Sequence, residues 1–488
     1  MENNNVNSIE VGKVTYDSDM QSTDLDSIQL SSNEYLTGLL KMVILSAIGI
    51  FVFFFSVPVN GESKIVFAVI YNAFINMFGN FAYWILLTLI GGNLIVHLKY
   101  KYFDKSPKVS LLAKIYENDT VVHSVLYAIG TLYALLYAMK VNVPGFEGVE
   151  IITGAATGGS VFPPIVLGVL GIITVGAVFM PLLLNYGVLE IIGVLLEPLM
   201  RPLFKVPGKA ALDATASFVS SSSLGVLITN RLWKMNVYTE KEMVTIMTGF
   251  SAVSIGFAYL VIETAGLADQ FIKVYGISFI LVFLIAPIMV RIPPVSRKKD
   301  IFFNGHEQTV EERMEETSYN SKTLSRGFNR AVKRAYIAKS LGYNLKESLK
   351  DSILIIPQVL TMLSAVGVSA LILAEYTPVF NWVGYVFEPI VRVLQIPDAA
   401  IIAASIPIGI AEMFLPVLLI QNHIEVLSIE ARAFVTIVSM VQIIFFSETA
   451  TVMLATKSPI KVREIVICFI ERTLIAMPLA AIAIHIFF

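Results

Sequence analysis

Apolar stretches of about 20 residues recur along this chain of 488 residues, and they constrain its fold more than any other feature. A stretch of that length can cross a bilayer as a helix, in which every backbone polar group is hydrogen-bonded within the segment. Hydrophobic residues make up 56% of the chain and charged residues only 15%, whereas a soluble domain has roughly 25% charged residues. The composition therefore predicts an all-α polytopic membrane protein in contact with a lipid bilayer.

Charge and cysteine content argue against several other classes of protein. The formal net charge is −2, whereas proteins that bind nucleic acid carry a basic surface, so we expect no nucleic-acid partner. The single cysteine, Cys468, and the five scattered histidines offer neither a disulfide framework nor a metal cluster, and we expect no metal or cofactor. No combination of nucleophile, base and orienting group is evident, so we do not expect an enzyme.

Basic loops set the expected topology, because short cytoplasmic loops collect Lys and Arg. Residues 1–36 are polar and are expected to form a disordered cytoplasmic tail. Residues 37–140 contain three leading spans, and the short apolar stretch Ile65–Phe78 among them is expected to be interfacial or half-buried. Further spans are expected at 161–184, 243–262, 271–290, 352–375, 433–455 and 465–488, and Thr239 with Glu242 fits a capping box that begins the second of these. We expect a multi-pass protein of the cytoplasmic (inner) membrane with a cytoplasmic N-terminus.

Two kinds of segment interrupt the series of spans. Residues 294–350 are hydrophilic and basic, and are expected to form a partly helical cytoplasmic linker. Residues 187–209 and 379–397 have apolar residues at helical spacing and are expected to be amphipathic surface helices. Each of these has a Glu and an Arg four residues apart, Glu197/Arg201 and Glu388/Arg392, which favours an ion pair within each helix.

The apolar segment Ala210–Asn230 contains four consecutive serines, Ser220, Ser221, Ser222 and Ser223. Lys209 precedes it and Arg231 follows it, so both of its ends are expected on the cytoplasmic side. A segment that enters and leaves on one side must turn inside the membrane, where its backbone must be buried in protein or line a wet cavity. We therefore expect a re-entrant hairpin.

An internal repeat relates the two halves of the chain. A shift of 191 positions aligns Val188 with Val379, and Glu197-Pro198-x-x-Arg201 with Glu388-Pro389-x-x-Arg392. The first repeat, at 161–293, is basic around its hairpin, whereas the second, at 351–488, is acidic there. The positive-inside rule therefore predicts two repeats of opposite orientation, with a substrate site at their interface.

The paired units, each with a surface helix carrying Glu-Pro-x-x-Arg, a hairpin and a broken helix, resemble the Gate, or nucleoside-recognition, domain. Concentrative nucleoside transporters, FeoB-type ferrous iron transporters and spore maturation proteins share this domain. The layout of the whole chain is most similar to the YjiH-like Gate-domain membrane proteins of bacteria. The chain lacks a GTPase-type Gly-rich phosphate loop, which argues against the FeoB function.

The repeat and the resemblance together select candidate substrate-binding residues. The 191-residue shift places Ser220–Ser223 on the region of Glu412, and an acid inside a membrane is costly unless it faces a cavity or a partner. Glu412 is therefore the first candidate, with assembly of neighbouring helices as the alternative. The resemblance implies that the broken helix of the second unit lines the site with Gln442, Ser447, Glu448 and Thr449.

Other polar residues in the spans have competing explanations. Ser251 lies on one helical face with Thr248 and Ser254, but such hydroxyls often bond to their own backbone. The four serines could allow close helix packing, and Glu448 could reach toward the cytoplasmic surface. The adjacent Glu471 and Arg472 are expected to form a structural or snorkelling pair.

Two functions follow from these patterns. One is a secondary transporter of a small polar solute, nucleoside-like by resemblance, coupled to Na⁺ or H⁺ through Glu412 or Glu448. The other is a Gate-domain subunit that does not transport and acts through a membrane partner protein, which the basic linker favours. A homo-oligomer is compatible with either function.

Overall fold

The computed structural model describes residues 8–11, 14–17, 22–59, 62–103, 116, 119–208, 210–211, 214, 222–250, 253–313, 319–446, 449–456 and 458–488. Within these residues the helices and their connections are accompanied by two short β-hairpins, β1–β2 (Ser8–Val11, Val14–Asp17) and β3–β4 (Ser56–Val59, Glu62–Ile65). Seven described helical segments are long and apolar enough to cross a membrane. The fold is therefore that of the polytopic all-α membrane protein expected from the sequence.

The leading spans are α1 (Ser32–Phe54), α3 (Ala82–Leu98) and α5 (Val121–Asn142), close to the expected ranges. Ser31 and Glu34 begin α1 with a capping box, in which each side chain bonds the other's backbone N–H. The apolar stretch after α1 forms the short helix α2 (Val66–Asn76), which packs against α8 (Leu167–Leu184) and buries Phe67 and Tyr71. Short helices α6 (Glu150–Thr153), α7 (Gly158–Val161) and η4 (Phe162–Val166) precede α8.

The helices after α8 occur in the same order in the two halves of the chain. The first half contains α9 (Val188–Leu199), η5 (Met200–Phe204), α11 (Ser222–Lys234), α12 (Glu240–Gly249), α13 (Ile255–Thr264) and α14 (Phe271–Met289). The second half contains α17 (Leu341–Tyr376), α18 (Val379–Val393), α19 (Ala399–Ile402), η8 (Ile406–Ile410), α20 (Leu415–Gln421), α21 (Ile429–Gln442), α22 (Thr449–Ala455) and α23 (Val462–Phe487).

Element boundaries follow the 191-residue shift. The shift superposes the first residues of α9 and α18, the first residues of α14 and α23, and the last residues of α13 and α22. Packing between the halves is reciprocal, because α11 contacts α22 while its counterpart α20 contacts α13. The repeat is therefore visible in the structure, whereas the direction in which each half crosses a membrane stays a prediction.

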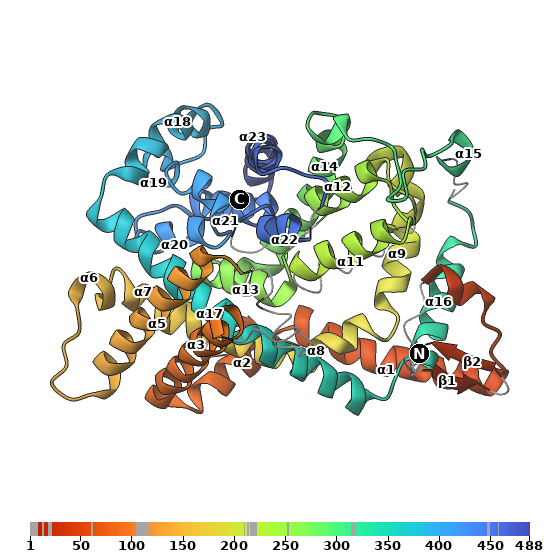
Figure 1. The fold of residues 1–488 in the computed structure, drawn as a ribbon, viewed down its shortest axis with the longest axis horizontal. Helices are drawn as coiled ribbons and strands as arrows, with labels where there is room; N and C mark the ends of the chain where they lie inside the picture. The colour runs from red at the N-terminus through yellow and green to blue at the C-terminus, as the bar shows by residue number, and fades with distance from the viewer. Residues whose placement is uncertain are drawn as a thin grey trace.

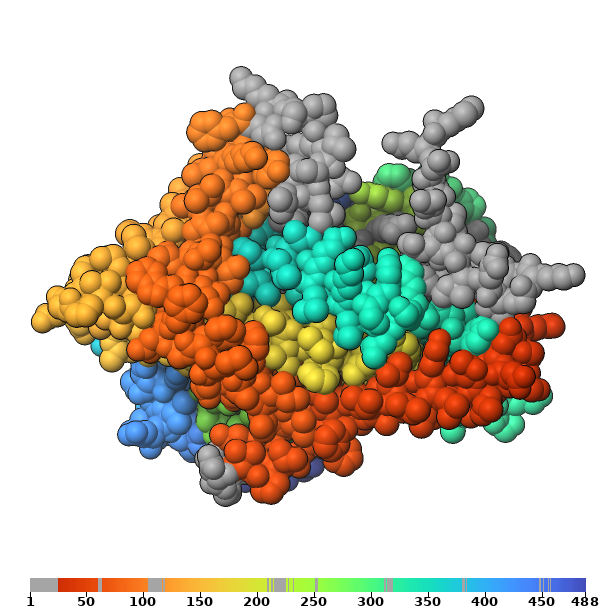
Figure 2. All heavy atoms as spheres, turned by 90° about the horizontal axis from the view of Figure 1, so that it is seen from below, coloured from red at the N-terminus to blue at the C-terminus, as the bar shows by residue number. Residues whose placement is uncertain are grey.

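Three long helices share one face of the molecule. Figure 2 shows α8 between α1 and α17, and α8 contacts both. In Figure 1 these helices lie along the lower side, α14, α18 and α23 lie along the upper side, and the hairpin and broken helices lie between. α17 begins at Leu341, inside the expected linker, and is 36 residues long. Buried polar contacts join it to the leading spans, since Asn93 Nδ2 on α3 donates to Thr361 Oγ1 at 3.1 Å.

The linker contains η7 (Val295–Arg297), α15 (Val310–Arg313) and α16 (Thr323–Ile337). α16 packs against both α1 and α9, and three arginines one turn apart, Arg326, Arg330 and Arg334, face acidic residues there. Arg326 Nη2 lies 2.8 Å from Glu197 Oε2, and Arg334 Nε lies 2.7 Å from Glu190 Oε1. The polar side of α9 is therefore covered by the linker helix α16.

Two expectations are wrong in this region. Glu197 pairs with the linker arginines, and Arg201 Nη1 instead lies 2.6 Å from Glu242 Oε1, so the ion pair expected within this helix does not form. The corresponding pair on α18 does form, with Arg392 Nη2 at 2.6 Å from Glu388 Oε1. The expected disorder of residues 1–36 does not hold for 22–36, because Leu25 and Ile28 are buried against Ile337 of α16.

Candidate functional site

Both halves have a helix that is interrupted near its middle. The expected span 243–262 is divided into α12 and α13, and the expected span 433–455 into α21 and α22. Thr239 and Glu242 begin α12 with the expected capping box, and Ser254 begins α13 by accepting from the N–H of Phe257. Interrupted helices expose backbone groups inside a protein, and membrane transporters use such breaks to hold substrates and ions.

The second interruption is held by Thr449, one of the predicted site residues. Its hydroxyl donates to the carbonyl of Ile443 at 3.0 Å and accepts from the N–H of Phe445 at 3.0 Å. Ile443 has φ of 48°, a left-handed conformation that is unfavourable for a β-branched residue. Such strain persists only where surrounding contacts impose it, and it is concentrated at functional sites.

Gln442, a second predicted residue, ends α21 and is 1% exposed. Its Nε2 donates to the carbonyl of Ile406 at 2.9 Å and to Thr473 Oγ1 at 3.1 Å. These bonds join α23 to residues 399–421, which contain α19, η8 and α20 and which the 191-residue shift matches to the expected hairpin Ala210–Asn230; we call them the hairpin 399–421. Its Oε1 has no hydrogen-bond partner among the described residues. This oxygen lies against Gly409, where a Cβ would come within 1.9 Å of it.

Glu412 lies at the tip of the same hairpin and is 8% exposed. Its Oε1 accepts from the N–H of Phe414 at 3.3 Å, and the carbonyl of the intervening Met413 accepts from Ser439 Oγ of α21. In the same hairpin, the carbonyl of Ile410 accepts a hydrogen bond from the N–H of Phe446 at 2.8 Å. The structure thus places Glu412, Gln442 and Thr449 around the contact between the hairpin and the interruption of α21 and α22.

The remaining predicted residues are not brought into this arrangement by the described structure. Ser220, Ser221, Ser251, Ser447 and Glu448 lie outside the described residues. Ser222 and Ser223 are the first residues of α11, which packs against α22. No three His, Cys, Asp or Glu side chains within the described part of the chain gather in a metal-binding group.

The sequence-based selection missed Arg472, which is 0% exposed on α23. Its Nε donates to the carbonyl of Val441 at 2.5 Å, and its Nη1 donates to the carbonyl of Thr248 at 3.1 Å. These carbonyls lie in the last turns of α21 and α12, one from each half. The expected pairing with Glu471 is therefore wrong, and the guanidinium instead joins the two interrupted helices.

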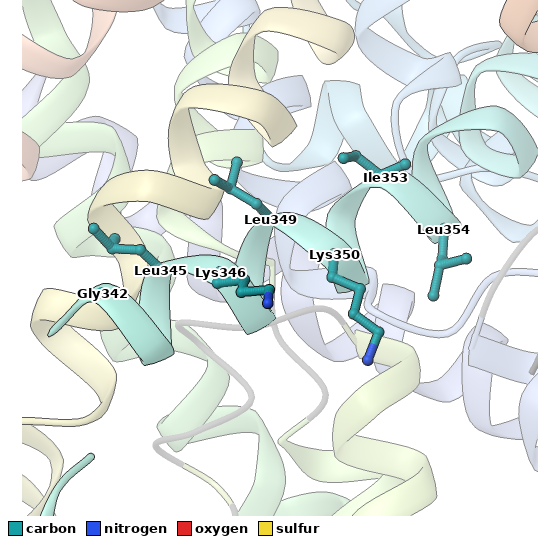
Figure 3. A pocket seen from close by; sticks show the side chains of 7 residues that line it. All are labelled: Gly342, Leu345, Lys346, Leu349, Lys350, Ile353 and Leu354. Atoms are coloured by element: carbon teal, nitrogen blue, oxygen red, sulfur yellow. The ribbon is translucent and has the colours of Figure 1, made fainter. Parts of the chain in front are cut away.

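A groove of about 620 Å³ lies elsewhere, along the first turns of α17. Its lining is apolar apart from Lys346 and Lys350, and Figure 3 shows their side chains with those of Leu345, Leu349, Ile353 and Leu354. None of the predicted site residues lines it. The buried polar contacts between the hairpin, α21, α12 and α23 are therefore the better candidate site.

Comparisons with known proteins bear on this arrangement. Residues 166–268, which include α9, α12 and α13, match the model of the Gate family, described as nucleoside recognition. The uncharacterized protein BpOF4_10220 of Alkalihalophilus pseudofirmus is 32% identical over 364 residues, which are 75% of this chain and 76% of that protein.

Two solved structures of the protein CNTnw show a weaker likeness. The inward-facing substrate-bound state has a TM-score of 0.44 and 14% identity, and covers 93% of this chain and 98% of its own. An intermediate 2 state of a variant also has a TM-score of 0.44 and 14% identity, and covers 92% and 100%. At these scores the likeness does not establish a shared fold. The identity with the bacterial relative does establish a family: the chain belongs to the same family as BpOF4_10220, and its residues 166–268 match the Gate (nucleoside recognition) domain.

Proposed function

We propose that this protein is a secondary transporter of a small polar solute of the nucleoside class. The observation that carries the proposal is the meeting of two interrupted helices, α12 and α21, with buried polar side chains deep in an apolar fold. A soluble-protein core has no need of such breaks, because each one leaves backbone groups that require new partners. The nucleoside-recognition match over the first half agrees in substrate class.

The proposed binding site lies between the hairpin 399–421 and the interruption of α21 and α22. Gln442 would present its free Oε1 to a donor on the solute, and Glu412 would accept from hydroxyl or amine groups. Both residues are buried, so a solute that reaches them must be enclosed, and a hairpin must move to admit it. We also propose that the carboxylate of Glu412 binds the coupling proton or cation.

The alternative, a subunit that acts only through a partner, is weakened by the contacts of the linker. Its basic residues Arg326, Arg330 and Arg334 pair with acids of the same chain. The positive charge of these three arginines is therefore used within the chain, which leaves the other basic residues of the linker to attract a separate protein. A partner that co-purified in fixed ratio with a chain that binds no solute would restore this alternative.

Solute binding and uptake test the proposal directly. Full-length protein in detergent is screened by thermal shift against nucleosides, bases, amino acids and dipeptides, and hits are tested for uptake of radiolabelled solute into proteoliposomes. Glu412→Gln is expected to weaken binding at least about tenfold, since a hydrogen bond to a charged group contributes roughly 1.5–3 kcal/mol. The matched control is Glu425→Gln, because Glu425 is an exposed acid just after the same hairpin. No binding or uptake of any nucleoside would refute the proposal.

A further inference from the structure

The buried guanidinium of Arg472 lies where the two interrupted helices end. α12 ends at Gly249 and α21 at Gln442, so the carbonyls of their last turns have no partner within their own helices. Arg472 reaches one of these carbonyls from each helix, that of Thr248 and that of Val441. The contacts are direct, and the whole residue is buried.

In the described part of the chain, the local charges balance without a carboxylate. A helix C-terminus carries a partial charge of about −0.5, so two of them together offset roughly one positive charge. Among the described residues no acid forms an ion pair with Arg472, and its Nη2 has no hydrogen-bond partner. A buried arginine is costly unless something compensates its charge. Here the compensation comes from the two helix ends.

Backbone carbonyl oxygens at helix ends are also groups that can bind a metal cation. In transporters built from interrupted helices, unwound carbonyls and half-helix C-terminal ends coordinate Na⁺ or receive H⁺. We infer that Arg472 is a resident cation that occupies this position permanently, so that the protein binds no Na⁺ there. If the protein is the transporter proposed above, solute binding then requires no Na⁺ at this position; only this consequence rests on the proposed function.

This assignment also explains why the chain buries an arginine, whose burial would otherwise destabilise the fold. A Na⁺ ion can leave and return during a transport cycle, whereas Arg472 is tethered to α23. The two helix ends therefore stay neutralised in every state of the protein. Any coupling to an ion must then act through another group. Glu412 is the acid of the proposed site that the structure describes, and we assign this role to it.

Thermal unfolding in different salts tests the inference without any solute. Purified full-length protein is measured in NaCl, KCl and choline chloride at equal ionic strength. The unmodified protein is expected to have the same Tm in all three salts. Arg472→Met removes the positive charge and its donors from the position, so it lowers Tm and creates a Na⁺-specific rise of at least about 2 °C, as expected for a ligand well above its Kd.

Two further variants separate charge from packing. Arg472→Lys keeps a positive charge and is expected to stay insensitive to Na⁺, although its Tm is lower because it donates to fewer carbonyls. Arg463→Gln removes an exposed arginine from the same helix and is expected to leave Tm and salt response unchanged.

The inference is overturned if Na⁺ specifically stabilises the unmodified protein, or if Arg472→Met is as insensitive to Na⁺ as Arg472→Lys. If the Met variant does not fold, the unmodified protein decides the question: equal Tm values in the three salts support the inference, and a Na⁺-specific rise refutes it. Because no nucleoside is present, these results stand apart from those of the solute screen. An absence of nucleoside binding would refute the proposed function and leave the Na⁺ result intact.

Discussion

Removing Arg334 from the linker helix is expected to destabilise the protein strongly, because it leaves a buried carboxylate without its counter-ion. Arg334 Nε lies 2.7 Å from Glu190 Oε1, and the two side chains are only 15% and 6% exposed. Taking one partner from a buried pair typically costs about 3–5 kcal/mol. We therefore expect Arg334→Met to lower the free energy of unfolding by about this amount.

The second half of the chain supplies the control. Arg392 and Glu388 form the same kind of ion pair at 2.6 Å on the corresponding helix α18, but the arginine is 64% exposed. Exposed pairs four residues apart on a helix contribute about 0.3–0.5 kcal/mol. Arg392→Met thus removes an arginine whose partner lies on α18, the counterpart of the helix that carries Glu190, at a position where water already solvates the charges.

Thermal unfolding of the full-length protein in detergent gives the measurement. Scaling to this chain length gives roughly 1–2 °C in Tm per kcal/mol, so Arg334→Met should lower Tm by about 3–10 °C and Arg392→Met by less than about 1 °C. The double variant Glu190→Gln/Arg334→Met should regain much of the loss, because an amide needs no counter-ion. Equal losses in the two single variants would refute the argument from burial.

Three other predictions use single positions. Gly409→Ala should weaken solute binding, because a Cβ there comes within 1.9 Å of Gln442 Oε1. Gly176→Ala on α8 is the control and should leave solute binding unchanged, because a Cβ added there meets no neighbouring atom within 4 Å. Arg330 donates to Asp26 and holds the pKa of that carboxyl below its ordinary value, so the pair stabilises the protein above the unfolded-state pKa of Asp26 and stops doing so as pH falls through the lower folded pKa. The difference in Tm between the unmodified protein and Asp26→Asn should therefore shrink below about pH 4. A difference that stays constant with pH would contradict this. Cysteines introduced at Asn422 and Lys234 should react with impermeant reagents from opposite sides of the membrane, against a background of one buried cysteine, and labelling from the same side would contradict the inverted repeats.

The sequence predicted what local patterns and the repeat determine. The capping box of Thr239 and Glu242 needs only four consecutive residues, and it is present. The 191-residue shift predicted corresponding helices because the same apolar spacing produces the same helix boundaries in both halves. The ion pair of Glu388 and Arg392 also formed as expected, since no other charge competes for it on an exposed helix.

Long-range contacts account for the residues that were misassigned. Glu197 was expected to bond Arg201, but Arg326, 129 residues away, lies closer once α16 covers α9. Arg472 was paired with its neighbour Glu471, yet its guanidinium bonds carbonyls 31 and 224 residues away. Backbone carbonyls carry no sequence signature, so an arginine that binds them is recognisable only after the helix ends are located. The helix break at Ile443 likewise has no Gly or Pro at its start, and contacts such as that of Thr449 hold it.

The two amphipathic helices show how one repeated element comes to serve two purposes. α9 buries Glu190 and Glu197 against the linker helix, so moving it would break several ion pairs in a buried setting. No helix of the linker covers α18 within the described residues, and Trp382 and Tyr385 are 64% and 70% exposed, as suits an aromatic face at a membrane interface. A transporter must shift some elements while others stay in place. Because the free-energy cost of displacing α18 is smaller, we propose that the hairpin that follows it, which contains Glu412, is the element that opens the proposed site.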